Sequence, residues 1–217
     1  MDLFPLWLSL RVALSATALT LVVGIPVALL LARARFAGRG LFEAVVVLPL
    51  VLPPTVLGYY LLVVIGSRGP LGRALAAVGL ELAFTWWAAV LAASIGSVAL
   101  LIKSAQAGFE TVDRQLEQAA RTLGRSEWSV FWSVTLPLAW RAVLAGAVLA
   151  FCRALGEFGI TLMVAGNIPG RTQTLPLAIY DRVQAAQMNE ANALALIAVG
   201  IVVVLVFGLS RVARLRY

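Results

Sequence analysis

Few residues of this 217-residue chain are of types that carry out chemistry. The sequence has no histidine, one cysteine (Cys152) and one lysine (Lys103). The usual general base is therefore missing, and a lone cysteine forms neither an internal disulfide nor a paired-cysteine metal site. No glycine-rich loop precedes Lys103, so the chain lacks a phosphate-binding P-loop. We expect no catalytic residue, no metal site and no cofactor bound by this chain.

One charged pair, Arg153 and Glu157, interrupts an apolar stretch with i,i+4 spacing. Charges are costly in lipid, so both side chains should face protein or a water-filled cavity. The pair either fixes helix packing or, with Thr161, forms the polar lining or gate of an anion path, where Arg153 attracts an oxyanion. A membrane-embedded hydrolase is a weaker alternative, because Glu157 is nearly the only intramembrane acid.

Proline interrupts a second apolar stretch, where Pro49, Pro53, Pro54 and Thr55 lie close together. Each proline removes an intrahelical hydrogen bond and crowds the preceding turn, so an uninterrupted helix is impossible here. At membrane depth the freed carbonyl groups need protein or water partners, which places a broken helix in a buried or cavity-facing position. We interpret this segment as part of a translocation path; a kinked packing helix is the alternative.

A charged, helix-prone loop at residues 106–137 lies within an otherwise apolar chain. Residues 111–123 carry apolar side chains at helical spacing, and Gly124 is suited to end that helix in a left-handed turn. Ser126 can cap a second helix whose first turn contains Glu127, and Pro137 suits the first turn of the next membrane segment. Two short helices meeting at a sharp corner are predicted. An ordinary amphipathic surface helix is the alternative.

The composition predicts a single integral membrane domain spanning residues 1–217, because 62% of residues are hydrophobic and 12% charged. Crossing a hydrocarbon layer takes roughly 20 helical residues. Five stretches meet that length, and the first has no basic flank and is too long for a cleaved signal peptide, so it should remain in the mature protein. The predicted spans are 7–32, 42–66, 85–105, 138–164 and 192–211.

Small residues recur every fourth position in the fourth predicted span, at Ala142, Gly146, Ala150 and Ala154. Such a stripe lets membrane helices approach closely, so it predicts a packing face. Gly156 and Gly159 follow, and we expect a helix break there, because residues 138–164 are more than one perpendicular crossing needs.

The net charge of +7 follows the predicted membrane topology, which argues against nucleic acid as a partner. Five spans place the two termini on opposite sides of the membrane. In either orientation, one side of the membrane then carries eleven of the 17 basic residues. By the positive-inside rule, the N-terminus is outside and the C-terminus and the 106–137 loop are cytoplasmic. The eleven residues are Arg33, Arg35, Arg39, Lys103, Arg114, Arg121, Arg125, Arg141, Arg211, Arg214 and Arg216.

The loop resembles the "EAA" coupling loop of ABC importer permeases, in which Glu-Ala-Ala is followed at fixed spacing by Gly and by Leu-Pro. One position departs, since Gln118 stands where the family has Glu. Glu117 lies one residue earlier, about 100° round a helix, so any ion pair it makes must come from another angle. The matching residues are Ala119, Ala120, Gly124, Val134, Leu136 and Pro137.

Along its whole length the chain resembles bacterial molybdate ABC transporter permeases, through the proline-rich segment, residues 113–124, Gly156-Glu157-Phe158-Gly159 and residues 171–176. The resemblance implies the all-α, type I importer permease fold and a homodimer with its pore on the two-fold axis. It also implies two cytoplasmic ABC ATPase subunits that use ATP and Mg²⁺, a periplasmic molybdate-binding protein, and a location in the bacterial inner membrane. Loops 67–84 and 166–190 would contact that binding protein or act as plain connectors.

Other substrates and other transport classes stay open. Tungstate and sulfate permeases look similar to molybdate permeases, so the oxyanion rests on resemblance alone. An ATP-independent channel or secondary transporter would need no coupling loop and would usually show inverted repeats, which these five spans do not show.

Overall fold

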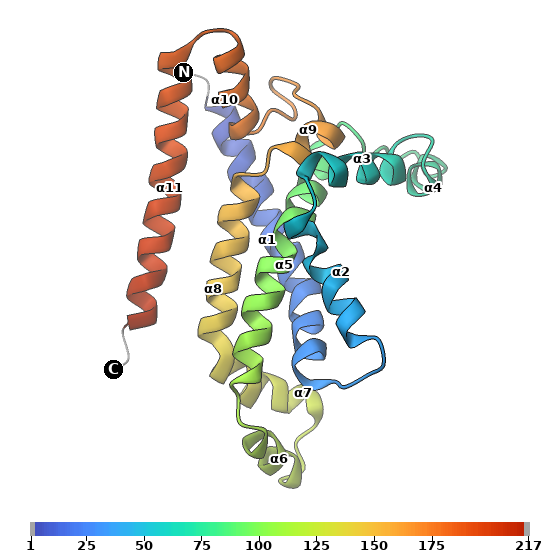
Figure 1. Ribbon diagram of the computed structural model, residues 1–217, viewed down its shortest axis with the longest axis vertical. Helices are drawn as coiled ribbons and strands as arrows, with labels where there is room; N and C mark the ends of the chain where they lie inside the picture. Colours follow the sequence, from blue (N-terminus) through green and yellow to red (C-terminus); the bar gives the residue numbers. More distant parts are fainter. Residues whose placement is uncertain (1–2, 215–217) are drawn as a thin grey trace.

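The computed structural model describes residues 3–214, and this part of the chain is helical without any β-strand. Figure 1 shows long helices side by side, with short helices capping both ends of the bundle. The short helices α6 and α7 form one end, and α9 and α10 lie at the other. The elements are α1 (Phe4–Arg33), α2 (Arg39–Val51), α3 (Pro54–Ile65), α4 (Pro70–Ala76), α5 (Trp86–Glu110), α6 (Arg114–Thr122), α7 (Glu127–Val130), the π-helix η1 (Phe131–Thr135), α8 (Leu136–Leu155), α9 (Gly159–Ala165), α10 (Leu175–Gln184) and α11 (Met188–Arg214).

Helix α5 is the centre of the bundle and packs against α1 and α8. Small residues permit this close contact. If Gly108 carried a Cβ atom, it would lie 2.4 Å from the Cβ of Ala142, and a Cβ on Gly146 would lie 2.9 Å from the Cβ of Ser104; both distances are too short for carbon atoms in contact. Ala150 is fully buried. The predicted small-residue stripe is therefore a packing face, and it packs against α5 of the same chain.

Four helices are long and apolar enough to cross a membrane, and the bent pair α2 and α3 makes up to five. The expected fold of about five spans is confirmed. The second span breaks at Leu52 and Pro53, where α2 and α3 meet at 110°. The fifth predicted span corresponds to α11, which begins at Met188, while Arg216 lies outside the described residues.

The predicted start of the 138–164 span was wrong, whereas the helix break expected at Gly156 and Gly159 is confirmed. The helix begins at Glu127, continues through η1 into α8 and ends at Leu155. Pro137 therefore does not open a separate segment; the π-helical turns directly precede this proline, which has no N–H to donate. At the other end, residues 156–158 separate α8 from α9, as the two glycines predicted.

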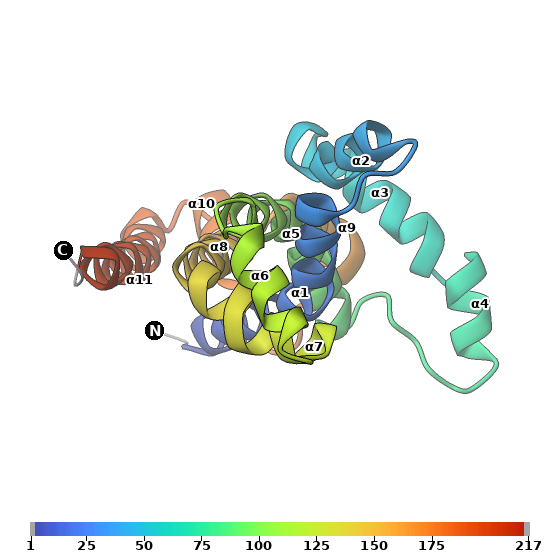
Figure 2. The ribbon, with the colours of Figure 1, turned by 90° about the horizontal axis from the view of Figure 1, so that it is seen from below.

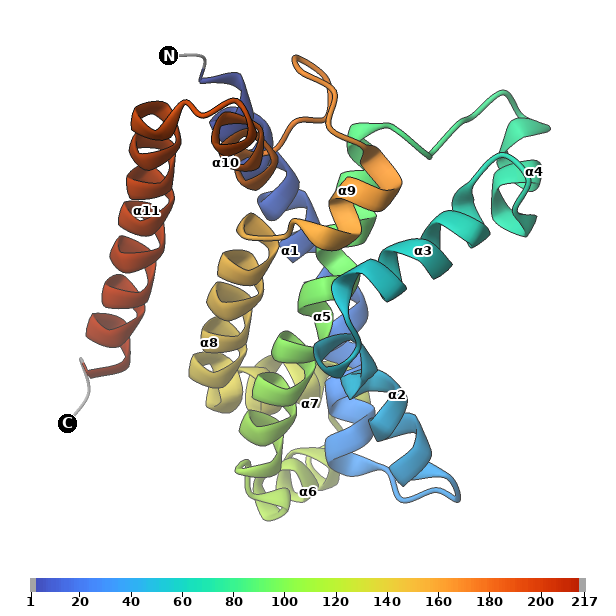
Figure 3. The ribbon, with the colours of Figure 1, turned by 45° about the horizontal axis from the view of Figure 1, so that its top comes forward.

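Helices α2, α3 and α4 form an arm beside the bundle, which is clear in the view from below and in the tilted view (Figure 2, Figure 3). No residue of α2 is buried in this single chain. Charged side chains hold α2 to α5: Lys103 pairs with Glu43, and Arg39 Nη2 lies 3.7 Å from Glu110 Oε1. Helix α3 packs on α9 instead.

Candidate functional site: the coupling loop and the broken helices

The corner of the coupling loop (residues 106–137) is built from local hydrogen bonds. Asp113 Oδ1 accepts from the Gln115 amide at 2.9 Å and caps α6. Gly124 has φ +81°, and the Arg125 and Gly124 amides donate to the carbonyls of Ala120 (3.2 Å) and Arg121 (2.9 Å). This is a Schellman ending, in which glycine takes the left-handed position at no steric cost. The predicted corner at Gly124 is confirmed.

The second half of the corner is fixed by Ser126 and by an ion pair. Ser126 Oγ accepts from the Ser129 amide at 3.3 Å, as expected of a cap. Arg121 donates from Nε and Nη2 to both oxygens of Glu127, at 2.6 and 3.0 Å. The hydrogen bond to Glu127 raises the pKa of Arg121 above its ordinary value. This bidentate ion pair links α6 to α7 across the glycine corner.

Glu117 points inward and anchors the loop to the first span. Its side chain is 5% exposed, and its Oε1 lies 2.7 Å from Arg33 Nη2 at the end of α1. Thr135 Oγ1 donates to the same oxygen at 2.7 Å. Arg33 Nη2 also donates to the Val112 carbonyl at 3.4 Å, and Arg114 Nη2 donates to the Ala32 carbonyl at 3.5 Å. The carboxylate of Glu117 therefore joins three elements, α1, α6 and η1, at this end of the bundle.

The opposite face of α6 is open to solvent. Gln118 and Ala119 are exposed, and so are the apolar side chains Leu116 (50%) and Leu123 (84%). Leu136 and Pro137 lie further along, in the first turn of α8. Helix α6 therefore has a buried anchor, Glu117, on one face and an exposed apolar tip, Leu116 and Leu123, on the other. The sequence alone did not identify Arg33 and Thr135 as partners of Glu117.

The two broken helices meet each other. A Cβ on Gly159, the first residue of α9, would lie 2.7 Å from the Cβ of Pro54, and a Cβ on Gly58 would lie 2.7 Å from the Cβ of Met163. Glycine is thus needed where α3 crosses α9. Of the predicted path residues, Pro54 lies at this crossing with Thr55 directly after it, whereas Pro49 lies inside α2. Thr161 of α9 is 1% exposed within the chain.

Arg153 and Glu157 form the predicted ion pair, with 2.7 Å between Nη1 and Oε2. Glu157 is buried, and its Oε1 accepts from the Ile160 amide at 2.9 Å at the start of α9. Its Oε2 packs against α5, where a Cβ on Gly96 would approach it to 2.7 Å. That oxygen makes no aligned hydrogen bond, although the Arg153 guanidinium is near. The pair therefore fixes the α8–α9 break and places one guanidinium beside it.

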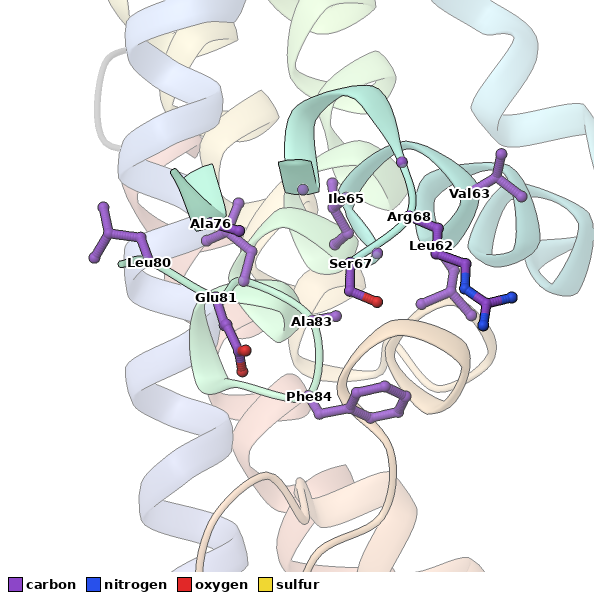
Figure 4. Close-up of a pocket in the computed structure, with 14 residues that line it drawn as sticks. Leu62, Val63, Ile65, Ser67, Arg68, Ala76, Leu80, Glu81, Ala83 and Phe84 are labelled. Atoms are coloured by element: carbon purple, nitrogen blue, oxygen red, sulfur yellow. The ribbon is translucent and has the colours of Figure 1, made fainter. Parts of the chain in front are cut away.

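A cavity of about 580 Å³ lies at the outer end of the arm, between α3, α4 and residues 80–84. Figure 4 shows Arg68 and Glu81 on opposite sides of it. None of the predicted site residues line this cavity. Among the described residues, no group of three or more His, Cys, Asp or Glu side chains is arranged to hold a metal ion.

Comparison with known proteins places the chain in a family. The model of the binding-protein-dependent transport system inner membrane component family matches residues 24–215, and the chain belongs to this family. The molybdenum transport system permease protein ModB of Haemophilus influenzae is 46% identical, covering 89% of this chain and 85% of that protein. ModB of Escherichia coli K12 is 48% identical, covering 82% of this chain and 78% of that protein. Among solved structures, a chain of the MetNI methionine ABC transporter in an inward-facing conformation has a TM-score of 0.72 at 18% identity. The match covers 97% of this chain and 93% of that chain.

These comparisons confirm the expected family and fold. The chain is a multi-pass membrane component of a binding-protein-dependent transport system, and its helices have the arrangement of an ABC importer permease. The coupling loop and the broken helices are thus two parts of a transport protein: one reaches beyond the membrane bundle, and the other interrupts it.

Proposed function

We propose that the chain is the permease subunit of an ATP-driven importer that moves molybdate into the cytoplasm. The observation that carries the proposal is the coupling loop, a protruding corner whose buried carboxylate ties it to α1 while its apolar tip is exposed. A rigid element of this kind can pass movement from a soluble motor to a helical bundle. A channel or secondary transporter has no use for it.

The partners follow from the same loop. Two ABC ATPase subunits, which bind ATP and Mg²⁺, would dock on the coupling loops of a permease homodimer, and a periplasmic molybdate-binding protein would deliver the substrate. Leu116 and Leu123 give the ATPase an apolar contact, with Gln118 and Ala119 between them. In this proposal Glu117 acts as a positioning residue, because its carboxylate is occupied by Arg33 and Thr135.

The orientation is proposed from the charges. Arg33, Arg39, Arg114 and Arg121 lie at or near helix ends that gather at the α6 end of the molecule (Figure 1). The positive-inside rule favours that end on the cytoplasmic side, with the start of α1 outside. Loops 67–84 and 166–190 then face the binding protein.

The translocation path is proposed at the crossing of α3 and α9. Broken helices at membrane depth are tolerated where they are buried in protein or line water. The break at Pro53 and Pro54 meets the break after Leu155, and Arg153 and Glu157 lie beside the latter. A partly exposed guanidinium there would attract an oxyanion.

Molybdate is proposed because the relatives named above are molybdenum transport system permeases, and tungstate and sulfate are the alternatives. Uptake of labelled molybdate should be measured in proteoliposomes containing the permease, its ATPase and its binding protein. Block by excess tungstate but not by sulfate is expected. Block by sulfate, with labelled sulfate entering, would replace molybdate with sulfate as the substrate.

A further inference from the structure

Two adjoining cavities lie between α1 and the α7–η1 segment, at the membrane end of the coupling loop. One, of about 390 Å³, is bordered by the polar residues Arg33, Glu117, Arg121, Glu127 and Thr135. The other, of about 560 Å³, is bordered by Leu21, Val22, Ile25, Trp128, Trp132 and Leu136. They share Pro26, Leu29, Glu127 and Phe131, so they form one continuous groove with a polar and an apolar end.

The apolar end is bordered by a candidate membrane span on one side and by aromatic rings on the other. Residues 21–29 of α1 belong to a membrane span, and Val22 is 73% exposed. On the other wall, Trp132 contacts both Trp128 and Phe131, with ring centroids 5.8 and 5.3 Å apart. The π-helical turns carry two of these three rings. An apolar groove that opens toward lipid is filled more favourably by an acyl chain than by water.

The charges at the polar end sum to zero, since two arginines face two glutamates. Glu117 is buried and occupied by Arg33 and Thr135. Glu127 is 76% exposed as a side chain, so its carboxylate can accept further hydrogen bonds. The Arg33 guanidinium donates to Glu117 and to the Val112 carbonyl through Nη2 alone, and its side chain is 19% exposed, so part of the guanidinium is open to the groove.

A ligand that matches this groove needs a phosphate for the guanidinium donors, an N–H donor for Glu127, and a long acyl chain. We propose that the groove binds one zwitterionic aminophospholipid, with its acyl chain along Val22 and Trp132, its phosphate at Arg33 and Arg121, and its ammonium group at Glu127. An anionic headgroup without an amine would offer Glu127 no donor beyond the one it already has in Arg121. A choline headgroup carries the same charge but has no N–H to donate.

The bound lipid would join α1 to the coupling loop from the membrane side, where Glu117 and Arg33 already join them from within the protein. This inference rests on the membrane location of the family and does not depend on the transported substrate.

Native mass spectrometry of the full-length chain, purified in detergent and titrated with lipids of identical acyl chains, tests the proposal. Phosphatidylethanolamine should be retained about tenfold better than phosphatidylcholine or phosphatidylglycerol, the effect of one charge-assisted hydrogen bond. Glu127→Gln should abolish the preference over phosphatidylcholine, and Trp128→Ala should weaken retention of all three lipids.

Matched controls exist at the other end of the molecule. Glu190 is 52% exposed and pairs with Arg182 at 3.0 Å, as Glu127 pairs with Arg121, and Trp7 is 65% exposed. Glu190→Gln and Trp7→Ala should leave lipid retention unchanged. Equal retention of the three lipids, preference for phosphatidylglycerol, or an undiminished preference in Glu127→Gln would overturn the proposal. Loss of the lipid on adding the ATPase subunit would assign the groove to the ATPase interface instead.

Discussion

The anchoring of the coupling loop by Glu117 predicts a large and local effect of Glu117→Gln. The amide keeps the size of the side chain and can still accept one hydrogen bond, but it removes the charge that faces Arg33 at 2.7 Å. Removing one partner of a buried ion pair costs roughly 3–5 kcal/mol. Because Arg33 is 19% exposed and one hydrogen bond survives, we expect about 2 kcal/mol here.

A loss of this size should appear as local opening. About 2 kcal/mol raises the population in which α6 is detached by roughly 30-fold, since 1.4 kcal/mol is a factor of ten. Hydrogen–deuterium exchange of the permease should therefore speed up by about that factor at the amides of α6, with little change in the centre of α5. The same variant should weaken association with the ATPase in a pull-down, because the tip is no longer held in one position.

Gln118→Ala is the matched control, since Gln118 is the adjacent residue and is exposed. It should leave exchange in α6 unchanged and lower ATPase association less than Glu117→Ala does. A double-mutant cycle with Arg33→Gln should show strong coupling to Glu117. Unchanged exchange in Glu117→Gln, or an effect of Gln118→Ala as large, would refute the anchoring role.

Three substitutions at glycines test the corner of the coupling loop, the packing of α5 on α8, and the contact between α5 and Glu157. Gly124→Val should destabilise the corner by about 1 kcal/mol or more, because φ is +81° there, and should uncouple ATP hydrolysis from uptake. Gly124→Asn should retain coupling. Normal uptake in the valine variant would refute the role of the corner in coupling. Gly108→Ala should destabilise the protein by about 1–3 kcal/mol in thermal melts, because it crowds the α5–α8 contact. Gly200→Ala should be neutral or stabilising, because a Cβ there meets no atom within 4 Å. Equal melting temperatures for the two variants would refute tight packing between α5 and α8. Gly96→Ala should displace the buried carboxylate of Glu157 and lower the melting temperature. The effect should be smaller in a Glu157→Ala background, which removes the clashing oxygen, and an unchanged effect there would refute the contact.

Local features of the site were predictable from the sequence because short-range chemistry decides them. A glycine in a left-handed turn, a serine cap and a run of prolines act within a few residues, so the corner at Gly124, the cap at Ser126 and the break at Pro53 followed directly. The helix break between Leu155 and Gly159 was predictable for the same reason.

Contacts between distant residues were not predictable. Arg33 and Glu117 are 84 positions apart, and the sequence indicated only that Glu117 faces a different direction from Gln118. The start of the fourth span was also missed, because Pro137 is usually a boundary and here lies just after a π-helical turn inside a continuous helix. Tertiary packing decides these features, and it leaves little trace in a single sequence.

ATP-driven import is tested by supplying ATP to only one side of proteoliposomes that contain the permease, its ATPase and its binding protein. Labelled molybdate should accumulate only when ATP is present on the side to which the coupling loop and its α6 tip are exposed. Uptake at the same rate without ATP, or with ATP on the opposite side alone, would refute transport driven through the coupling loop.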